Sequence, residues 1–459
     1  MWAVGSQLDR ISAQLKSNSI TSLFLPSFIS INSSNINQLL DALSANTSLE
    51  ELYLVDHNIN KDELKKVGEV IGNHKSLYKV SVGHSKIGEC VEELSGLLEG
   101  VLKSKSIRVI NFSKQSLSGD GLKTIKDVMM VNNGGELHEI NLADNQLTKE
   151  SIPHLIEIIN ANPQLHTLEL GENSFNTVTD ELVESLSKSN IKKLVLNNCP
   201  IGDHGAVAIA KLMSNNKSLQ QILLNNCDIQ ELGSSHIGNS LVSWKGSVFS
   251  ASYNSSMFHH LFNDWDQTKL SELHNQGVLS DIESISLKGC MIGDQGLIKI
   301  VKGIKHFPRL KVLDLANNKL TAKGIESLES ILLGPDSTIK ELNISFNHLG
   351  KEGQDIIHNW IKSGELVSLD SLYISSIDLE FLDLFEIAKS LGDCNNSIKF
   401  LEAMNTIKPK FDEEVEKEEN EKEQNDEEDD EDEEETIEDQ FFELENTLKE
   451  EKSIKIKWM

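Results

Sequence analysis

The sequence predicts an α/β solenoid, in which short strands form a parallel inner sheet and helices cover its outer side. Its main sign is the pattern L-x-x-L-x-L, with mostly Leu, Ile or Val at the fixed positions, recurring every 26 to 30 residues. An Asn or Cys and another aliphatic residue often follow, and apolar residues then recur at i, i+3 and i+4. The first spacing predicts a strand and the second a helix. One such unit cannot bury its own core, so the units must stack on their neighbours.

The repeats run through residues 19–408. Their copies begin at Ile20, Leu49, Leu77, Ile107, Leu137, Leu165, Ile191, Leu219, Ile282, Leu310, Ile339, Leu369 and Ile398. The gap after Leu219 holds a degenerate copy at Val248-Ala251-Tyr253, which gives about fourteen repeats with an irregular stretch at 233–281. Strand-plus-helix repeats of this length resemble the ribonuclease-inhibitor class of leucine-rich repeats. That resemblance implies a horseshoe with a concave sheet wide enough to grip a whole globular protein.

Two segments depart from the repeat pattern before its end. Residues 1–18 are amphipathic around Leu8, Ile11 and Leu15, and we expect them to cap the open N-terminal edge of the core. The stretch from Trp244 to Trp265 is rich in aromatic residues. It is either a protruding docking loop or a divergent repeat whose aromatic side chains fill the core. Its aromatic residues are Trp244, Phe249, Tyr253, Phe258, Phe262 and Trp265.

The negative charge of the chain is concentrated near its C-terminal end. The formal net charge is −29, and residues 412–451 contribute 24 Asp or Glu and 3 Lys, which leaves −8 for the rest. We expect residues 409–436 to form a disordered acidic tail, because such a segment buries too little apolar surface to offset chain entropy. An acidic tail favours basic proteins as partners.

The last residues, 437–459, regain an amphipathic pattern. Ile437, Phe441, Leu444 and Leu448 have helical spacing, and Ile454, Ile456 and Trp458 then alternate with lysines as in a strand. This short C-terminal segment either binds a partner as a peptide motif or folds back on the last repeat.

Composition excludes several classes of function. A mildly acidic body has no charge with which to hold nucleic acid phosphates or an anionic membrane surface. There is no apolar run of 18 residues, and Asp9 and Arg10 stand where a signal peptide has its apolar core, so we expect a cytoplasmic, perinuclear or nuclear protein. The five cysteines include no C-x-x-C pair, and no catalytic or nucleotide motif is present. We therefore expect no metal, no cofactor and no enzymatic chemistry of its own.

The concave side of the sheet is the predicted binding surface. The second and third x of each L-x-x-L-x-L point to that side, and the loop after the strand continues it. These positions are rich in carboxylates, amides and lysines. Candidate contact residues are Glu169, Lys193 and Asn197 on the strands, and Asp144, Glu172, Asn198 and Asn226 in the loops. By contrast, Asn145, Asn173, Cys199, Cys227 and Cys290 occupy the buried Asn/Cys position, where an amide or thiol stabilises the turn.

A family resemblance gives this surface a more specific function. The run from Leu194 to Ala210, LVLNNCPIGDHGAVAIA, resembles the repeats of the Ran GTPase-activating proteins, as does PQLHTLELGENSF at 163–175. Those proteins are also ribonuclease-inhibitor-type solenoids followed by an acidic tail. The resemblance implies acceleration of GTP hydrolysis by a Ran-like GTPase, a switch of nucleocytoplasmic transport. It makes Asn198 the loop asparagine that helps to orient the glutamine of the GTPase.

The chain departs from that family at one functional position. The family carries an arginine one repeat earlier, whereas the corresponding stretch here, LTKESIP at 147–153, offers Lys149 as its nearest base. Lysine lacks the planar fork of a guanidinium. Two alternatives therefore remain open. One is an interaction scaffold without activator function, serving cytoskeletal or signalling partners, and the other is an acidic-tailed binder of basic proteins such as histones.

Overall fold

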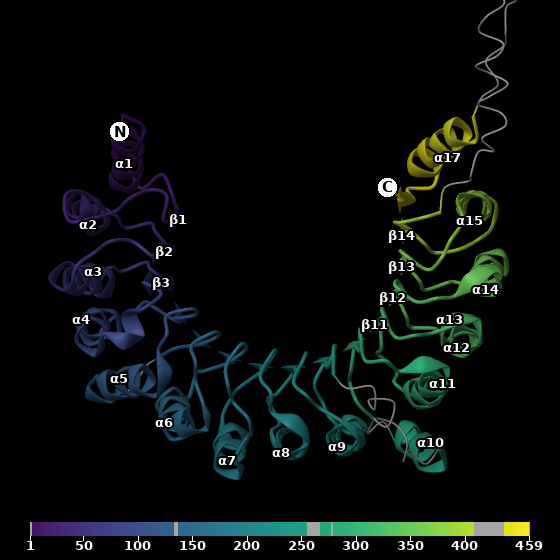
Figure 1. Cartoon of the computed structure of the whole chain (residues 1–459), viewed down its shortest axis with the longest axis horizontal. Helices are drawn as coiled ribbons and strands as arrows, with labels where there is room; N and C mark the ends of the chain where they lie inside the picture. The colour runs from purple at the N-terminus through teal and green to yellow at the C-terminus, as the bar shows by residue number, and fades with distance from the viewer. Residues whose placement is uncertain (1, 133–135, 255–266, 277–278, 408–435, 459) are drawn as a thin grey trace, which may run out of the picture. The chain divides into compact units, whose positions relative to one another are not determined.

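The computed structural model describes residues 2–132, 136–254, 267–276, 279–407 and 436–458. It divides the chain into two compact units, Met1–Asn254 (unit 1) and Ser255–Met459 (unit 2). Each unit is an α/β solenoid with a parallel strand layer on one side and a helix layer on the other, as the sequence predicts (Figure 1). The acidic stretch at 409–435 lies outside the described residues.

In unit 1 each strand pairs in parallel with the next one along the chain. The strands are β1 Ser22–Leu25, β2 Glu51–Val55, β3 Lys79–Gly83, β4 Val109–Asn111, β5 Glu139–Asn141, β6 Thr167–Glu169, β7 Lys193–Val195, β8 Gln221–Leu223 and β9 Val248–Ser250. The helices are α1 Trp2–Lys16, α2 Ile36–Ala45, α3 Lys61–Asn73, α4 Val91–Val101, α5 Ser118–Val131, α6 Ile152–Ala161, α7 Asp180–Lys188, α8 Gly202–Asn215 and α9 Glu231–Leu241. Short 3₁₀ turns precede α4 and α6, at Ile87–Glu89 and Lys149–Ser151.

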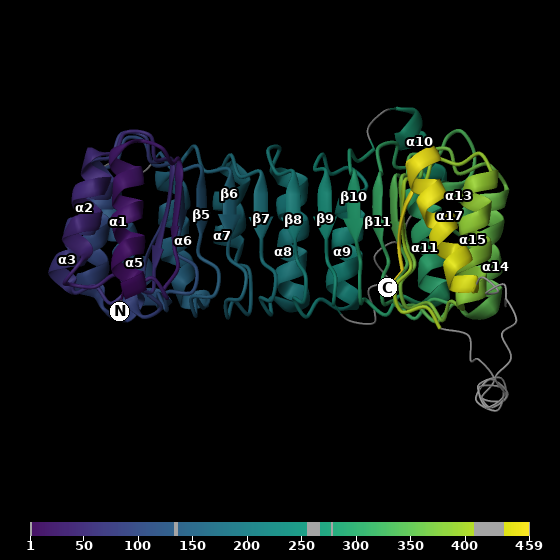
Figure 2. The same cartoon turned by 90° about the horizontal axis from the view of Figure 1, so that it is seen from above.

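Unit 2 repeats the arrangement (Figures 1 and 2). Its strands are β10 Ser284–Ser286, β11 Val312–Asp314, β12 Glu341–Asn343, β13 Ser371–Tyr373, β14 Phe400–Glu402 and β15 Lys455–Lys457. Its helices are α10 Gln267–Asn275, α11 Gly293–Ile304, α12 Ala322–Glu326, α13 Glu329–Leu332, α14 Gly350–Lys362, α15 Phe381–Asp393 and α17 Ile437–Glu451.

The repeat leucines make the core of each unit. In unit 1 the strand register places Leu23, Leu52, Val80 and Ile110 side by side, and all four are buried. Burying a side chain of this kind stabilises the fold by about 1.5–3 kcal/mol. Because the strands pair in the same register, the apolar positions recur at the same place in each repeat.

The Asn/Cys position satisfies backbone groups between neighbouring repeats, as predicted. Asn173 accepts from the N–H groups of Asn145 and Leu147, both at 3.0 Å, and its own amide lies within hydrogen-bond distance of three carbonyl oxygens. Cys199 and Cys227 replace the amide with a buried thiol that donates to a carbonyl oxygen at 3.2 and 3.0 Å. Burial raises the pKa of Cys199 to about 11 and that of Cys227 to about 12, so neither thiol is reactive at neutral pH.

The irregular stretch contains a true repeat in a register different from the expected one. The strand β9 buries Phe249, and Ala251 directly after it is also buried, whereas Tyr253 is 49% exposed. Phe249 pairs with Ile222 of β8, so the expected alignment on Val248, Ala251 and Tyr253 is wrong by two residues at each position. A phenylalanine in place of the central leucine hid the pattern. Trp244 is also buried, which agrees with a divergent repeat, and Phe258, Phe262 and Trp265 lie outside the described residues.

Different elements cover the hydrophobic core near the two ends of the chain. In unit 1, α1 places Leu8 and Leu15 in the core. In unit 2, the C-terminal segment folds back on the last repeat: β15 pairs in parallel with β14, and α17 packs beside α15. The rings of Phe441 and Trp458 lie 5.2 and 5.3 Å from the ring of Phe381, and both are buried. Of the two alternatives for this segment, the structure has the intramolecular one.

Candidate protein-binding surface

The strands in the middle of unit 1 carry a small polar cluster on their concave side. The ammonium of Lys193 on β7 lies 2.7 Å from a carboxylate oxygen of Glu169 on β6, and the amide of Asn141 on β5 donates to the other oxygen at 3.0 Å. Lys193 and Glu169 are 33% and 23% exposed. The structure therefore brings these two candidates together, and they satisfy each other while keeping an accessible edge.

The loops form a second, regular row of side chains. The third residue after most strands has a positive φ near +55° and donates its N–H to the next repeat, and we call these positions the post-strand row. In unit 1 the row contains Lys114, Asp144, Glu172, Asn198 and Asn226. Asn and Asp tolerate this conformation better than other residues with a Cβ. The row points its side chains into solvent at one edge of the strand layer.

Three of the four loop candidates are joined by hydrogen bonds. The amide of Asn198 donates to the carboxylate of Glu172, and the amide of Asn226 donates to the Asn198 oxygen at 2.9 Å. All three side chains are exposed, as is Asp144, which precedes Glu172 in the row without a bond to it. The result is a strip of ordered carboxylate and amide groups over three repeats, which can accept and donate hydrogen bonds to a partner.

The remaining two candidates lie apart from this strip. Asn197 is half-buried, and its oxygen accepts from the N–H of Asn225 at 2.9 Å, which gives it a structural role. Lys149 is exposed at the start of the 3₁₀ turn before α6. It lies two repeats before Asn198, because β6 comes between them, so the expected place one repeat before Asn198 is wrong. Lys149 shares the loop edge with Asn198, but no contact joins it to the strip.

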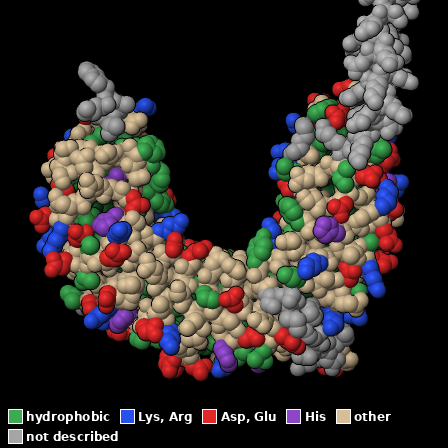
Figure 3. All heavy atoms as spheres, viewed as in Figure 1, with side chains coloured by type: hydrophobic (Ala, Val, Ile, Leu, Met, Phe, Trp, Pro, Cys, Tyr) green, Lys and Arg blue, Asp and Glu red, His purple; other side chains and the backbone are tan. Residues whose placement is uncertain are grey.

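Sequence reasoning missed an aromatic cluster on the first strands of unit 1. Phe24 on β1 is 67% exposed, its ring lies 5.9 Å from the ring of Tyr53 on β2, and the Lys79 ammonium on β3 lies 5.7 Å from the same Tyr53 ring. Phe28, in the loop after β1, is 78% exposed. Figure 3 shows hydrophobic side chains gathered on the inner side of this N-terminal part. Large aromatic residues at the third x of the first two repeats were the available signal.

No group of three or more His, Cys, Asp or Glu side chains in the described ranges has an arrangement suited to a metal ion. Among the helices of the described chain, none is long and apolar enough to cross a membrane.

Comparison with known families identifies the type of repeat. Residues 187–210, 308–328 and 336–353 match the family described as Leucine Rich repeat, so both units carry it. The chain is built from leucine-rich repeats. The mouse and human proteins named NACHT, LRR and PYD domains-containing protein 14 are 22% and 25% identical to it over 70% and 69% of its length. Protein CARMIL of Dictyostelium discoideum is 22% identical over 68% of the chain. The chain spans 31%, 26% and 23% of these three relatives, respectively.

Proposed function

We propose that this leucine-rich-repeat protein is a binding scaffold that holds a protein partner on the concave strand layer of unit 1. The observation that carries the proposal is the contact of the exposed Phe24 ring with the half-buried Tyr53, whose ring also lies near the Lys79 ammonium, with the exposed Phe28 close by in sequence. Exposed aromatic residues grouped on one face are typical of protein interfaces, where they supply most of the binding energy.

The polar strip fits the same function. Glu172, Asn198 and Asn226 are held in place by their mutual hydrogen bonds and by the positive-φ backbone, so a partner loses little side-chain entropy on binding them. An aromatic anchor with an ordered polar margin is the usual composition of a specific interface.

Chemical cross-linking in extract tests the scaffold, with the full chain as bait. The double variant Phe24→Ser with Phe28→Ser should lose the cross-linked partners of the wild type. The control is Leu232→Ser, which removes a hydrophobic side chain that is 52% exposed from α9 on the helix layer. An unchanged set of partners in the double variant would refute the scaffold surface.

We further propose, as a more specific form of this function, activation of a Ran-like GTPase by Asn198. Its exposed amide in the ordered strip supports the proposal, because a residue supplied in trans can position the attacking water through the glutamine of the GTPase. Lys149 lies on the same edge of the strand layer but does not contact the strip. The proposed activation of the GTPase therefore rests on Asn198 alone.

Single-turnover phosphate release from Ran loaded with GTP tests the activator function. Asn198→Ala should abolish stimulation, which for such residues reaches about 10³-fold. Asn317→Ala is the matched control, since Asn317 occupies the post-strand row of unit 2 with φ 55° and the same backbone hydrogen bond. Both variants place Ala at a positive φ and share its cost of about 1–2 kcal/mol. Absence of stimulation by the wild-type protein would rule out activation and leave the scaffold.

A further inference from the structure

A second row of side chains lies at the opposite edge of the strand layer. It consists of the residue immediately before each strand, and we call it the pre-strand row. Before β4 to β7 of unit 1 these residues are Arg108, His138, His166 and Lys192. His138, His166 and Lys192 each donate the backbone N–H to the carbonyl oxygen of the preceding row member, at 2.7, 2.8 and 2.7 Å. The backbone therefore fixes four basic or titratable side chains in line before any partner arrives.

These side chains have few partners of their own. The imidazole rings of His138 and His166 lie 5.4 Å apart at an angle of 37°. Within the described residues, the two imidazoles make no hydrogen bond or ion pair, and the Lys192 ammonium makes none either. Arg108 pairs at 2.8 Å with Glu136, which is 66% exposed and can be displaced.

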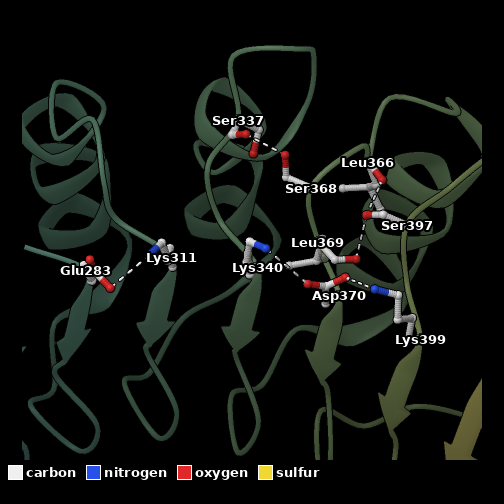
Figure 4. Close-up of polar contacts among 10 residues, drawn as sticks. All are labelled: Glu283, Lys311, Ser337, Lys340, Leu366, Ser368, Leu369, Asp370, Ser397 and Lys399. Atoms are coloured by element: carbon white, nitrogen blue, oxygen red, sulfur yellow. Dashed lines mark hydrogen bonds and ion pairs between the residues drawn. The ribbon is translucent and has the colours of Figure 1, made fainter.

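The same positions in unit 2 are filled differently. Figure 4 shows Lys311 directed toward Glu283, and Lys340 and Lys399 both directed toward Asp370. The distances are 3.0 Å for the first pair and 3.8 and 2.8 Å for the two lysines on Asp370. The fold thus accommodates a row in which each lysine has a carboxylate partner within the row, and nothing in the backbone requires the unpaired basic row of unit 1.

Burial and neighbouring positive charges favour the neutral form of His166 when no anion lies beside it. Burial, then Lys192 and then His138 hold the pKa of His166 below its usual value. The other charged residues at or beside these strand positions are Arg108, Glu136, Glu139, Glu169 and Lys193. Glu169 is already paired with Lys193 and Glu136 with Arg108, so Lys192 is left as a cation without an acid of its own, and an anion beside the two imidazoles would favour their protonated form.

We propose that Arg108, His138, His166 and Lys192 form a docking row for an extended, carboxylate-rich segment of a partner protein. Strands spaced by ~4.8 Å give the row a length of roughly 14 Å, which four or five extended residues span at ~3.3 Å each. The acidic post-strand row at the other edge, with Asp144 and Glu172, disfavours a long polyphosphate chain such as nucleic acid. This inference rests on the protein-binding function proposed above and supplies the chemistry of the partner.

Fluorescence anisotropy with a labelled hexaglutamate peptide and the full chain tests the docking row. The double variant His138→Gln with His166→Gln, and separately Lys192→Gln, should each weaken binding about tenfold. Wild-type binding should strengthen about fivefold from about pH 7.5 to about pH 6, because an anion favours the protonated imidazoles. This pH dependence should vanish in the double variant.

The control is the triple variant Lys311→Gln, Lys340→Gln and Lys399→Gln in unit 2, which should bind the peptide as the wild type does. Three outcomes would overturn the docking row. The control could weaken binding as much as the unit 1 variants do, the wild type could show no pH dependence, or a single-stranded oligonucleotide could bind more tightly than hexaglutamate. Lys192→Gln changes one exposed side chain, so it keeps the test valid if the histidine variant unfolds. If a partner protein no longer binds the double variant Phe24→Ser with Phe28→Ser but still binds Lys192→Gln, the scaffold function stands and the docking row is refuted.

Discussion

Unit 1 and unit 2 share one backbone arrangement before each strand, yet they use it for opposite purposes. In unit 2 the pre-strand row is a ladder of ion pairs around Glu283 and Asp370 (Figure 4). In unit 1 the same row sets His138, His166 and Lys192 beside one another without an acid between them. A repeat fold fixes where side chains stand but not their charge, so an unpaired row is a property of the sequence that stability alone does not explain.

The post-strand rows differ in the same way. Unit 1 presents Lys114 followed by carboxylates and amides, of which Glu172, Asn198 and Asn226 are linked by hydrogen bonds. Unit 2 presents Asn317, Phe346, Ser376 and Asn405 at the equivalent positions, with Phe346 half exposed. The backbone conformation is conserved between the units and the chemistry is not, which again separates architecture from recognition.

The largest expected effect concerns how the two units end. Phe441→Ala should destabilise unit 2 by about 3–5 kcal/mol, because the ring is fully buried against Phe381 and Trp458. Phe442→Ala, at the adjacent and 42% exposed position, should cost less than about 1 kcal/mol. Thermal unfolding of the two variants measures the difference. Similar losses would mean that the C-terminal segment does not hold unit 2 together.

The next effect tests whether the two units share one architecture. Asn173→Ala in unit 1 and Asn318→Ala in unit 2 each leave buried N–H and C=O groups without partners. Both should therefore lose about 2–3 kcal/mol in urea unfolding. Losses that differ by more than about 1 kcal/mol would break the equivalence of the two amide positions.

A smaller effect contrasts the two pre-strand rows directly. Asp370→Asn frees Lys340 and Lys399 from their shared carboxylate and should cost about 0.5–1 kcal/mol, a loss that shrinks in about 0.5 M NaCl. His166→Gln should change stability by less than about 0.5 kcal/mol at pH 7.5, since no pair is broken there. Comparable losses in denaturant titrations would show that His166 has a structural partner after all.

The smallest effect is a pH dependence that belongs to unit 1. The pKa of His166 is lower in the folded state, so the unfolded state binds its proton first. The stability contribution of neutral His166 is complete above about pH 7 and is lost as the pH falls through the folded-state pKa. His166→Gln should therefore reduce the fall in unfolding free energy between about pH 7.5 and pH 5.5. A pH slope equal to that of the wild type would contradict this assignment.

Much of the fold was predictable because the spacing of apolar residues along the chain indicates which of them are buried. The leucines of L-x-x-L-x-L, the buried Asn173 and Cys199, and the helical and strand patterns at 437–458 were all visible in one dimension. The repeat at β9 was misaligned because Phe249 fills the leucine position and its flanking residues lack the pattern. The loop strip was anticipated as a set of exposed residues, but the pairing of Lys193 with Glu169 and of Asn198 with its neighbours was not.

The sequence by itself determined that this protein is a leucine-rich-repeat solenoid, since a periodic apolar pattern can be buried only by stacking like units. Only the tertiary structure decided which surface residues meet. Phe24 and Tyr53 are 29 residues apart, and His138 and His166 are 28 apart, so their contacts depend on strand register that the chain order does not display. The C-terminal return of β15 to β14 was decided in the same way. Its pairing depends on the packing of Phe441 and Trp458 against Phe381 of α15. This contact joins segments that are distant in the sequence, so no local pattern predicts it.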